Sequence, residues 1–247
     1  MMLKDELAAP LAICAVAPFV SVVLIHDTGS KPELLTDLYK TQEFFPNIRI
    51  IERKIEDAHG WIASDVDKTF NERAAKPLGD IRREQHQISK DEGADFILIC
   101  DGDEIFSDGL ASKIPELCEN LPENKDAIFL PFIDLCHTFD LIRQTHWMGR
   151  IFRINTTSIR GNYPFEQHFS DRTNRCLEPY MSGEKEEVLK IPYTSDTACI
   201  HHMESLLKPH RKELSVKRRR EGILPSVLTD KRYSYFQEKI QKWLVKE

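Results

Sequence analysis

The alternation of apolar and polar positions divides the N-terminal part of the chain into strands, turns and helices. Residues 19–25 are an apolar, β-branched run that stops at the polar sequence His26-Asp27-Thr28-Gly29-Ser30, which predicts a strand and a turn. Leucines then recur at helical spacing from Leu34 onward, and residues 47–52 return to a strand pattern. Because parallel strands need a crossover of this kind, we predict a β-α-β unit.

The most apolar strand pattern leads directly into carboxylates. Residues 96–100 are all apolar, and Asp101-Gly102-Asp103-Glu104 follows at once. Such a run predicts a strand that is buried on both faces, and ligands of open α/β sheets bind beyond the carboxyl ends of their strands. Two carboxylates one residue apart offer hard oxygen ligands to Mg²⁺ or Mn²⁺, an ion that shares its site with substrate phosphates. The alternative is an acidic turn without function, because an isolated Asp-x-Asp is a short motif.

The rest of the chain repeats these patterns. Helices are predicted over residues 81–92 and 110–121 and in an amphipathic stretch that ends near residue 244; strands are predicted over 127–132, 147–154 and 197–203, and loops over 55–79 and 161–169. There is no repeat, low-complexity tract or linker. We therefore predict one α/β domain over residues 1–247, with a mixed, mostly parallel central sheet flanked by helices and a basic, helical C-terminal segment from about residue 205.

Composition and charge narrow the class of protein. An apolar content of 41% and a charged content of 30% are typical of a soluble globular chain, and the formal net charge of -6 argues against a general phosphate-backbone binder. The basic clusters His210-Arg211-Lys212 and Lys217-Arg218-Arg219-Arg220 are the exception. They are explained by a solvent-exposed helix face or by contact with a donor pyrophosphate, an anionic membrane surface or a nucleic-acid acceptor, and these alternatives stay open.

Cysteine usage and the N-terminal apolar stretch bear on the compartment. The six cysteines are scattered without a Cys-x-x-Cys pair, which indicates neither a zinc knuckle nor a disulfide framework and favours a reducing, cytoplasmic environment. Residues 7–25 are apolar but contain Pro10 and Pro18, and Lys4 is their only basic leader residue. We interpret this stretch as core structure rather than a targeting segment or a membrane span.

The order of these motifs resembles a known family. A strand with Asp-Thr-Gly-Ser, a helix, Asn-Ile-Arg-Ile-Ile-Glu-Arg, an arginine-bearing helix and Ala-Asp-Phe-Ile-Leu-Ile-Cys-Asp-Gly-Asp-Glu occur in sequence between Val20 and about Lys212. In this order and spacing the chain resembles the glycosyltransferases of family 2. The resemblance implies the Rossmann-type GT-A fold and a metal-dependent, inverting transfer of a sugar from a nucleotide-diphosphate donor to an acceptor hydroxyl on a glycan, a lipid-linked glycan or another glycoconjugate.

The resemblance also assigns roles on the donor side. Asp27 would lie near the donor nucleotide, and Asp103 would bind Mn²⁺ or Mg²⁺. Asp101 would lie near the donor ribose or the metal. Either Arg82 or Arg83, on the helix before the central strand, would face the donor pyrophosphate.

On the acceptor side the resemblance points to Glu166 as the base that takes the proton of the acceptor hydroxyl, and to His201 or His202 as a metal ligand at a strand end. From the residues alone, Asp140 is an alternative base. Arg150 and Arg153 are expected to point to opposite faces of their strand, so that one of them, taken here as Arg150, reaches an anionic substrate group.

Rival interpretations stay open. The family usually has a strand and a helix before the Asp-Thr-Gly-Ser turn, and only about two dozen residues precede it here. We interpret them as an abbreviated unit; otherwise residues 19–25 are themselves the first strand. The rival functions are a nucleotidyltransferase and a non-catalytic binding or scaffold protein of the same fold, and the predicted location is cytoplasmic, with a peripheral membrane contact as an option.

Overall fold

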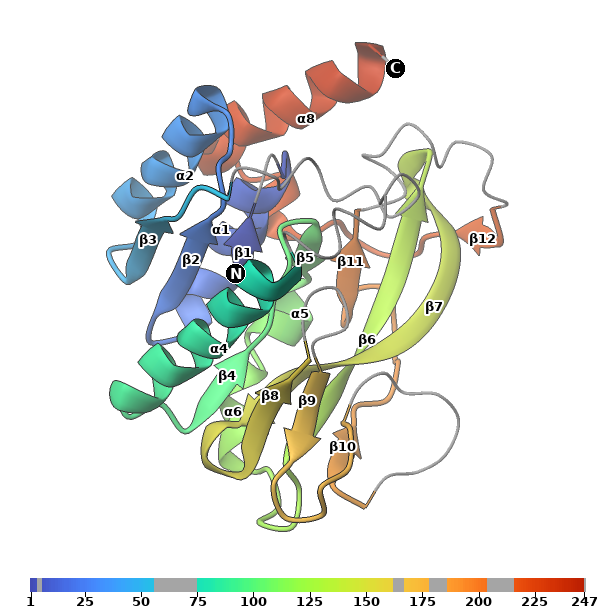
Figure 1. The fold of residues 1–247 in the computed structure, drawn as a ribbon. Helices are drawn as coiled ribbons and strands as arrows, with labels where there is room; N and C mark the ends of the chain where they lie inside the picture. Colours follow the sequence, from blue (N-terminus) through green and yellow to red (C-terminus); the bar gives the residue numbers. More distant parts are fainter. Residues whose placement is uncertain (4–5, 56–74, 162–166, 178–185, 204–215, 247) are drawn as a thin grey trace.

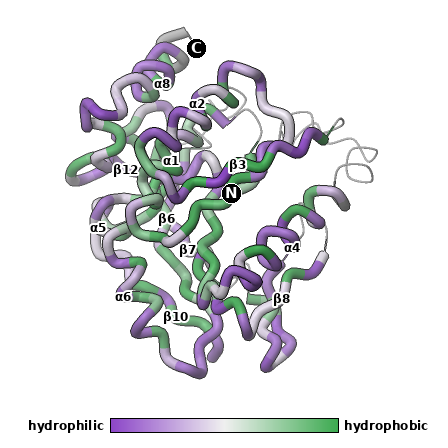
Figure 2. The backbone as a smooth tube through the Cα atoms, turned by 90° about the vertical axis from the view of Figure 1, so that its left-hand side faces the viewer, coloured by the Kyte–Doolittle hydropathy of each residue, from purple (hydrophilic) through white to green (hydrophobic). Residues whose placement is uncertain are grey.

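The computed structural model describes residues 1–3, 6–55, 75–161, 167–177, 186–203 and 216–246 (Figure 1). Within them the protein is a mixed α/β structure with a small parallel sheet and a larger curled, mixed sheet. Helices lie along the outside of both. Hydrophobic segments concentrate along the strands of the larger sheet in the interior (Figure 2).

The parallel sheet contains the predicted β-α-β unit. Its order is β1 (Met2–Leu3), β2 (Val23–Asp27) and β3 (Ile48–Glu52), and both pairings are parallel. Helix α2 (Pro32–Phe44) connects β2 to β3 and begins with a proline, whose fixed φ suits the first helical turn. The short β1 and the helix α1 (Ala9–Val16) form a brief strand–helix unit ahead of β2, in agreement with the abbreviated unit that the sequence suggested.

Strand β2 begins later than its apolar pattern predicted. Residues Ala17–Phe19 form the 3-10 helix η1, and β2 starts at Val23. The Asn47 side chain donates hydrogen bonds of 2.9 Å to the carbonyls of Ala17 and Val20. These tertiary hydrogen bonds stabilise a turn at residues 17–20, where β propensity alone predicts an extended strand.

The larger sheet has the order β12-β7-β6-β11-β5, with β10 paired to β6 and β4 paired to β7. Its strands are β4 (Phe96–Leu98), β5 (Glu104–Phe106), β6 (Ala127–Cys136), β7 (Thr138–Arg153), β10 (Val188–Lys190), β11 (Ile200–His202) and β12 (Arg218–Arg219). Among the described strands, β10 and β11 run parallel to β6 and the other pairings of this sheet are antiparallel.

The expectation of a mostly parallel central sheet is therefore wrong for this sheet. The reason is the long hairpin of β6 and β7, whose turn places His137 at a φ of 60° and returns the chain directly along its neighbour. A direct return makes the pair antiparallel, whereas a crossover helix would have made it parallel. Strand β6 is buried along its whole length and forms the centre of the core.

The remaining elements cover the sheets. They are α4 (Ala75–Asp91), α5 (Asp108–Ala111), α6 (Ile114–Glu119), η2 (Ile154–Thr156), the pair β8 (Thr157–Arg160) and β9 (Gln167–Ser170), η4 (Ser226–Leu228), η5 (Lys231–Tyr233) and α8 (Ser234–Lys246). The amphipathic C-terminal helix α8 lies beside α2 (Figure 1).

Two further predictions differ from the structure. Residues 110–121 form two short helices rather than one, and residues 218–219 form strand β12 beside β7 instead of a basic helix. Residues 56–74 and 210–212 lie outside the described residues. All six cysteines are free thiols, and none of the described helices is long and apolar enough to cross a membrane.

Candidate functional site

The acidic turn between β4 and β5 is the centre of the candidate site. The backbone N–H of Met203 donates to the carbonyl of Asp103 at 2.7 Å, which fastens the turn to the end of β11. Gly102 packs so closely against the β1–α1 connection that an added Cβ would lie 2.6 Å from Leu3 Cδ2 and 2.8 Å from Glu6 Cβ. Only glycine fits this position without movement of its neighbours, so the two aspartates flank a point of close backbone packing.

Two arginines from distant elements meet at Asp101. Arg82 of α4 donates to Asp101 Oδ1 at 2.8 Å, and Arg150 of β7 lies 3.4 Å from Asp101 Oδ2. Partial removal of water around Asp101 opposes its charge, but the two guanidinium groups outweigh this effect and lower its pKa to about 2. With 40% of its side chain exposed, Asp101 is an ionised carboxylate that remains open to solvent.

Glu104 is a third acid that the sequence did not single out. Its side chain is 2% exposed and forms an ion pair with Arg150, which is 6% exposed. Burial raises the pKa of Glu104 to about 7, although the Arg150 charge acts in the opposite direction. The sequence feature that could have identified Glu104 is its position directly before the apolar residues Ile105 and Phe106, with which it forms a buried strand.

Of the two adjacent imidazoles, His202 faces the acidic turn. Its Nε2 lies 3.8 Å from Asp103 Oδ2, and its Nδ1 donates to Asp134 Oδ1 at 2.8 Å. Burial opposes the imidazolium charge, but the hydrogen bond to Asp134 and the charge of Asp103 raise the pKa of His202 to about 9.

His201 points to the other face of β11, as strand alternation requires. Its ring is fully buried, and its Nε2 lies 2.9 Å from the carbonyl oxygen of Asp196. Burial lowers the pKa of His201 to about 4. The structure therefore does not bring His201 to the acidic turn, and the metal role expected for it has no geometric support.

The other donor-side candidates occupy separate positions. The Asp27 carboxylate is buried and accepts the backbone N–H groups of Gly29 and Ser30 at 3.2 Å, so it caps its own turn. Arg83 donates to the carbonyl of Gly161 at 2.7 Å and pairs with Asp80 at 2.6 Å. Thus Arg82, not Arg83, reaches the acidic turn.

On the acceptor side, Glu166 lies outside the described residues. Asp140 is exposed near the start of β7, where its carbonyl accepts the N–H of Arg220 at 2.7 Å. Arg153 donates to the carbonyls of Leu121 and Lys125, whereas Arg150 reaches carboxylates. The two arginines of β7 therefore have different partners, and the contact of Arg150 with an anionic substrate group stays a prediction.

The donor atoms of Asp103 and His202 fit a particular kind of metal site. Across 3.8 Å a carboxylate oxygen and a neutral imidazole nitrogen can share one divalent cation, so a metal here would have to displace the Nε2 proton of the His202 imidazolium. The described residues contain no group of three or more His, Cys, Asp or Glu side chains that could hold a metal. Mg²⁺ and Mn²⁺ often take one or two protein ligands and complete their shell with water and substrate phosphates, so the pair fits an ion that arrives with a diphosphate.

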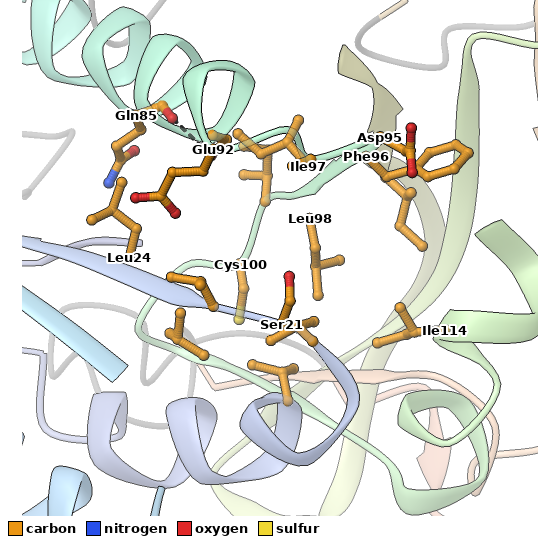
Figure 3. Close-up of a pocket in the computed structure, with 18 of the residues that line it drawn as sticks. Ser21, Leu24, Gln85, Glu92, Asp95, Phe96, Ile97, Leu98, Cys100 and Ile114 are labelled. Carbon is orange, nitrogen blue, oxygen red and sulfur yellow. Dashed lines mark hydrogen bonds between the residues drawn. The ribbon is translucent and has the colours of Figure 1, made fainter. Parts of the chain in front are cut away.

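A cavity of about 580 Å³ lies next to this site, between β2 and β4. Figure 3 shows Leu24 of β2, Leu98 of β4 and Gln85 of α4 around it. Arg82 also lines the cavity, whereas Asp101, Asp103 and His202 do not. The cavity and the acidic turn are thus separate spaces that share Arg82 as a wall.

Comparison of the chain with models of known protein families and with curated proteins finds no match.

Proposed function

We propose that this protein is a metal-dependent glycosyltransferase of GT-A-like fold that transfers a sugar, with inversion, from a nucleotide-diphosphate donor to an acceptor hydroxyl. The observation that carries the proposal is the convergence of Asp103 and His202 at 3.8 Å beside an ionised, solvent-accessible Asp101. The order of sequence motifs gives further support, because the resemblance to family 2 rests on several other motifs besides this acidic turn.

Each described residue of the site has a task in this reaction. Asp103 and His202 would hold Mn²⁺ or Mg²⁺, which when bound offsets the negative charge of the leaving diphosphate. Arg82 and Arg150 keep Asp101 ionised, so that its exposed oxygens can accept hydrogen bonds from the donor ribose. Glu166 remains the predicted base on the acceptor side.

The charge balance supports a metal rather than the arginines as the main partner of the diphosphate. Arg82 and Arg150 already lie against Asp101, and Arg150 also pairs with the buried Glu104. Their charge is therefore largely offset by carboxylates of the protein. A diphosphate beside the ionised Asp101 and Asp103 brings more negative charge than the single positive charge of the His202 imidazolium offsets, and a divalent cation on Asp103 would supply the larger charge.

The decisive experiment substitutes Asp103. The protein is screened by thermal shift with a panel of nucleotide sugars plus Mn²⁺, and turnover is then measured with the donor that stabilises it. Asp103→Asn should lower turnover at least about 100-fold and remove the Mn²⁺-dependent stabilisation, while the free protein stays folded. Asp171→Asn, at an exposed acid that has no role in the proposed site, is the matched control. Unchanged turnover in Asp103→Asn would disprove the proposal.

Product analysis separates the rival functions. Release of a nucleoside diphosphate or monophosphate supports sugar transfer, whereas release of pyrophosphate identifies a nucleotidyltransferase. If no nucleotide sugar stabilises the protein in the presence of Mn²⁺, a non-catalytic binding protein is favoured instead.

A further inference from the structure

Asp134 is a buried carboxylate in the middle of an otherwise apolar strand. Its side chain is 4% exposed, on a strand whose residues are all buried. It accepts hydrogen bonds from His202 Nδ1 at 2.8 Å and from the side-chain amide of Gln144 on the neighbouring strand β7. Burying a charge is costly unless the charge is paired, so these contacts indicate a specific task rather than packing alone.

The hydrogen bond to Asp134 determines the role of each of the two His202 ring nitrogens. The Gln144 amide donates to Asp134 Oδ2, and the other carboxylate oxygen, Oδ1, faces His202 Nδ1 as an acceptor. The proton between the two groups therefore sits on His202 Nδ1. Nε2 is then the ring nitrogen directed at Asp103.

The surroundings of Asp134 leave His202 as its main imidazole partner. His146 Nδ1 lies 3.7 Å from the same Oδ1, beyond hydrogen-bond distance, and its ring stacks on Phe132 with centroids 5.2 Å apart. Phe132 also meets the His202 ring edge to face at 6.3 Å. The His202 ring is thus held by one hydrogen bond and one aromatic contact from strand β6.

We propose that Asp134 is a positioning residue that fixes the His202 ring with Nε2 toward Asp103, and so presets a two-donor site for a divalent cation. The cation is the part that rests on the proposed function; the ring orientation does not. Outer partners of metal-binding histidines commonly act in this way, and their loss costs about 10- to 100-fold in metal affinity.

Two measurements test this in the full-length protein without any sugar donor. The first follows the His202 Nδ1–H proton by NMR with ¹⁵N-labelled histidine. The second measures the affinity for Mn²⁺ alone by electron paramagnetic resonance. In Asp134→Ala the Nδ1–H signal should be lost and the Mn²⁺ affinity should fall about 10- to 100-fold.

Two further variants make the test specific. Asp134→Asn keeps an oxygen that can accept from Nδ1, so it should retain the proton signal and restore part of the affinity. Asp196→Asn is the matched control, because Asp196 is equally buried but its contact with His201 uses the backbone carbonyl. It should leave both readouts of His202 unchanged.

The outcomes are distinguishable. An unchanged Nδ1–H signal in Asp134→Ala would overturn the positioning role, as would an equal fall of Mn²⁺ affinity in the Asp196→Asn control. If Asp134→Ala does not fold, Asp134→Leu, which is larger but also lacks an acceptor, decides, and wild-type Mn²⁺ affinity or a retained Nδ1–H signal in that variant overturns the role. If the wild type does not bind Mn²⁺ although Asp134→Ala loses the signal, the orientation stands and the metal part of the proposed function fails.

Discussion

Two acidic turns follow strands of this protein, and they satisfy their carboxylates in opposite ways. Asp27, after β2 of the parallel sheet, is 3% exposed and accepts backbone N–H groups two and three residues ahead. Asp101, after β4 of the larger sheet, is held by side chains from α4 and β7, which lie 19 and 49 residues away. The first turn is a local structure and the second is a tertiary one.

The difference teaches where a binding site can form. The carboxylate oxygens of Asp27 accept hydrogen bonds from its own turn, and only 3% of the residue is exposed to a ligand. Around Asp101 and Asp103, by contrast, cations and acids from four elements meet at a partly exposed surface. Although both turns looked like donor-side motifs in the sequence, the structure favours the second as the working one.

The largest effect is expected from removing the arginine that joins the second turn. Arg150→Met leaves the buried Glu104 without its ion pair and should lower the free energy of unfolding by about 3–5 kcal/mol at pH 8. The loss should be smaller at pH 5, because Glu104 then takes up a proton instead of remaining as a buried charge. Urea unfolding at the two pH values measures this, and Arg150→Met combined with Glu104→Gln should recover much of the stability. The same loss at both pH values would argue against the buried pair.

A somewhat smaller effect is expected at His202. Its pKa is raised from 6.5 to about 9 in the folded protein, so its charged form stabilises the fold. In metal-free buffer, His202→Asn should cost about 3 kcal/mol below pH 6.5, and this cost should fall away as the pH rises through 9. Unfolding of both proteins from pH 6 to 10 provides the test. A cost that does not change with pH would show that Asp134 and Asp103 do not hold an imidazolium.

The first turn should respond more weakly. Asp27→Ala removes the acceptor for the N–H groups of Gly29 and Ser30 and should cost about 1–2 kcal/mol. Asp27→Asn keeps one oxygen and should cost less. Equilibrium unfolding compares the two variants, and loss of nucleotide binding in Asp27→Asn with unchanged stability would break the contrast between the turns.

The smallest effect is expected at Arg83. Its ion pair with Asp80 joins side chains that are 37% and 46% exposed, so Arg83→Ala should change the free energy of unfolding by less than about 1 kcal/mol. Turnover should also stay near that of the wild type, whereas Arg82→Ala should reduce it. Equal losses in the two variants would mean that the position of Arg82 beside Asp101 is not what matters.

Much of the local architecture could be predicted from the sequence. The β-α-β unit of residues 23–52 was visible because leucine spacing and β-branched runs act within a few residues. The acidic turn was found because charge follows an apolar strand directly. The partners of Arg150 and Arg153 did not follow from strand alternation in the same way, because β7 has a bulge at Arg150, where its pairing with β6 passes from Ile151 to Gly149.

The sequence alone left two choices open, His201 or His202 and Arg82 or Arg83, and the tertiary structure decided that His202 and Arg82 reach the acidic turn. The tertiary structure also decided that β6 and β7 pair as a hairpin. It identified Asp134 and Glu104 as buried acids of the site. The physical reason is the same in each case. Periodicity tells which residues share a face of a helix or strand, but the direction of that face depends on packing against elements far away in the chain.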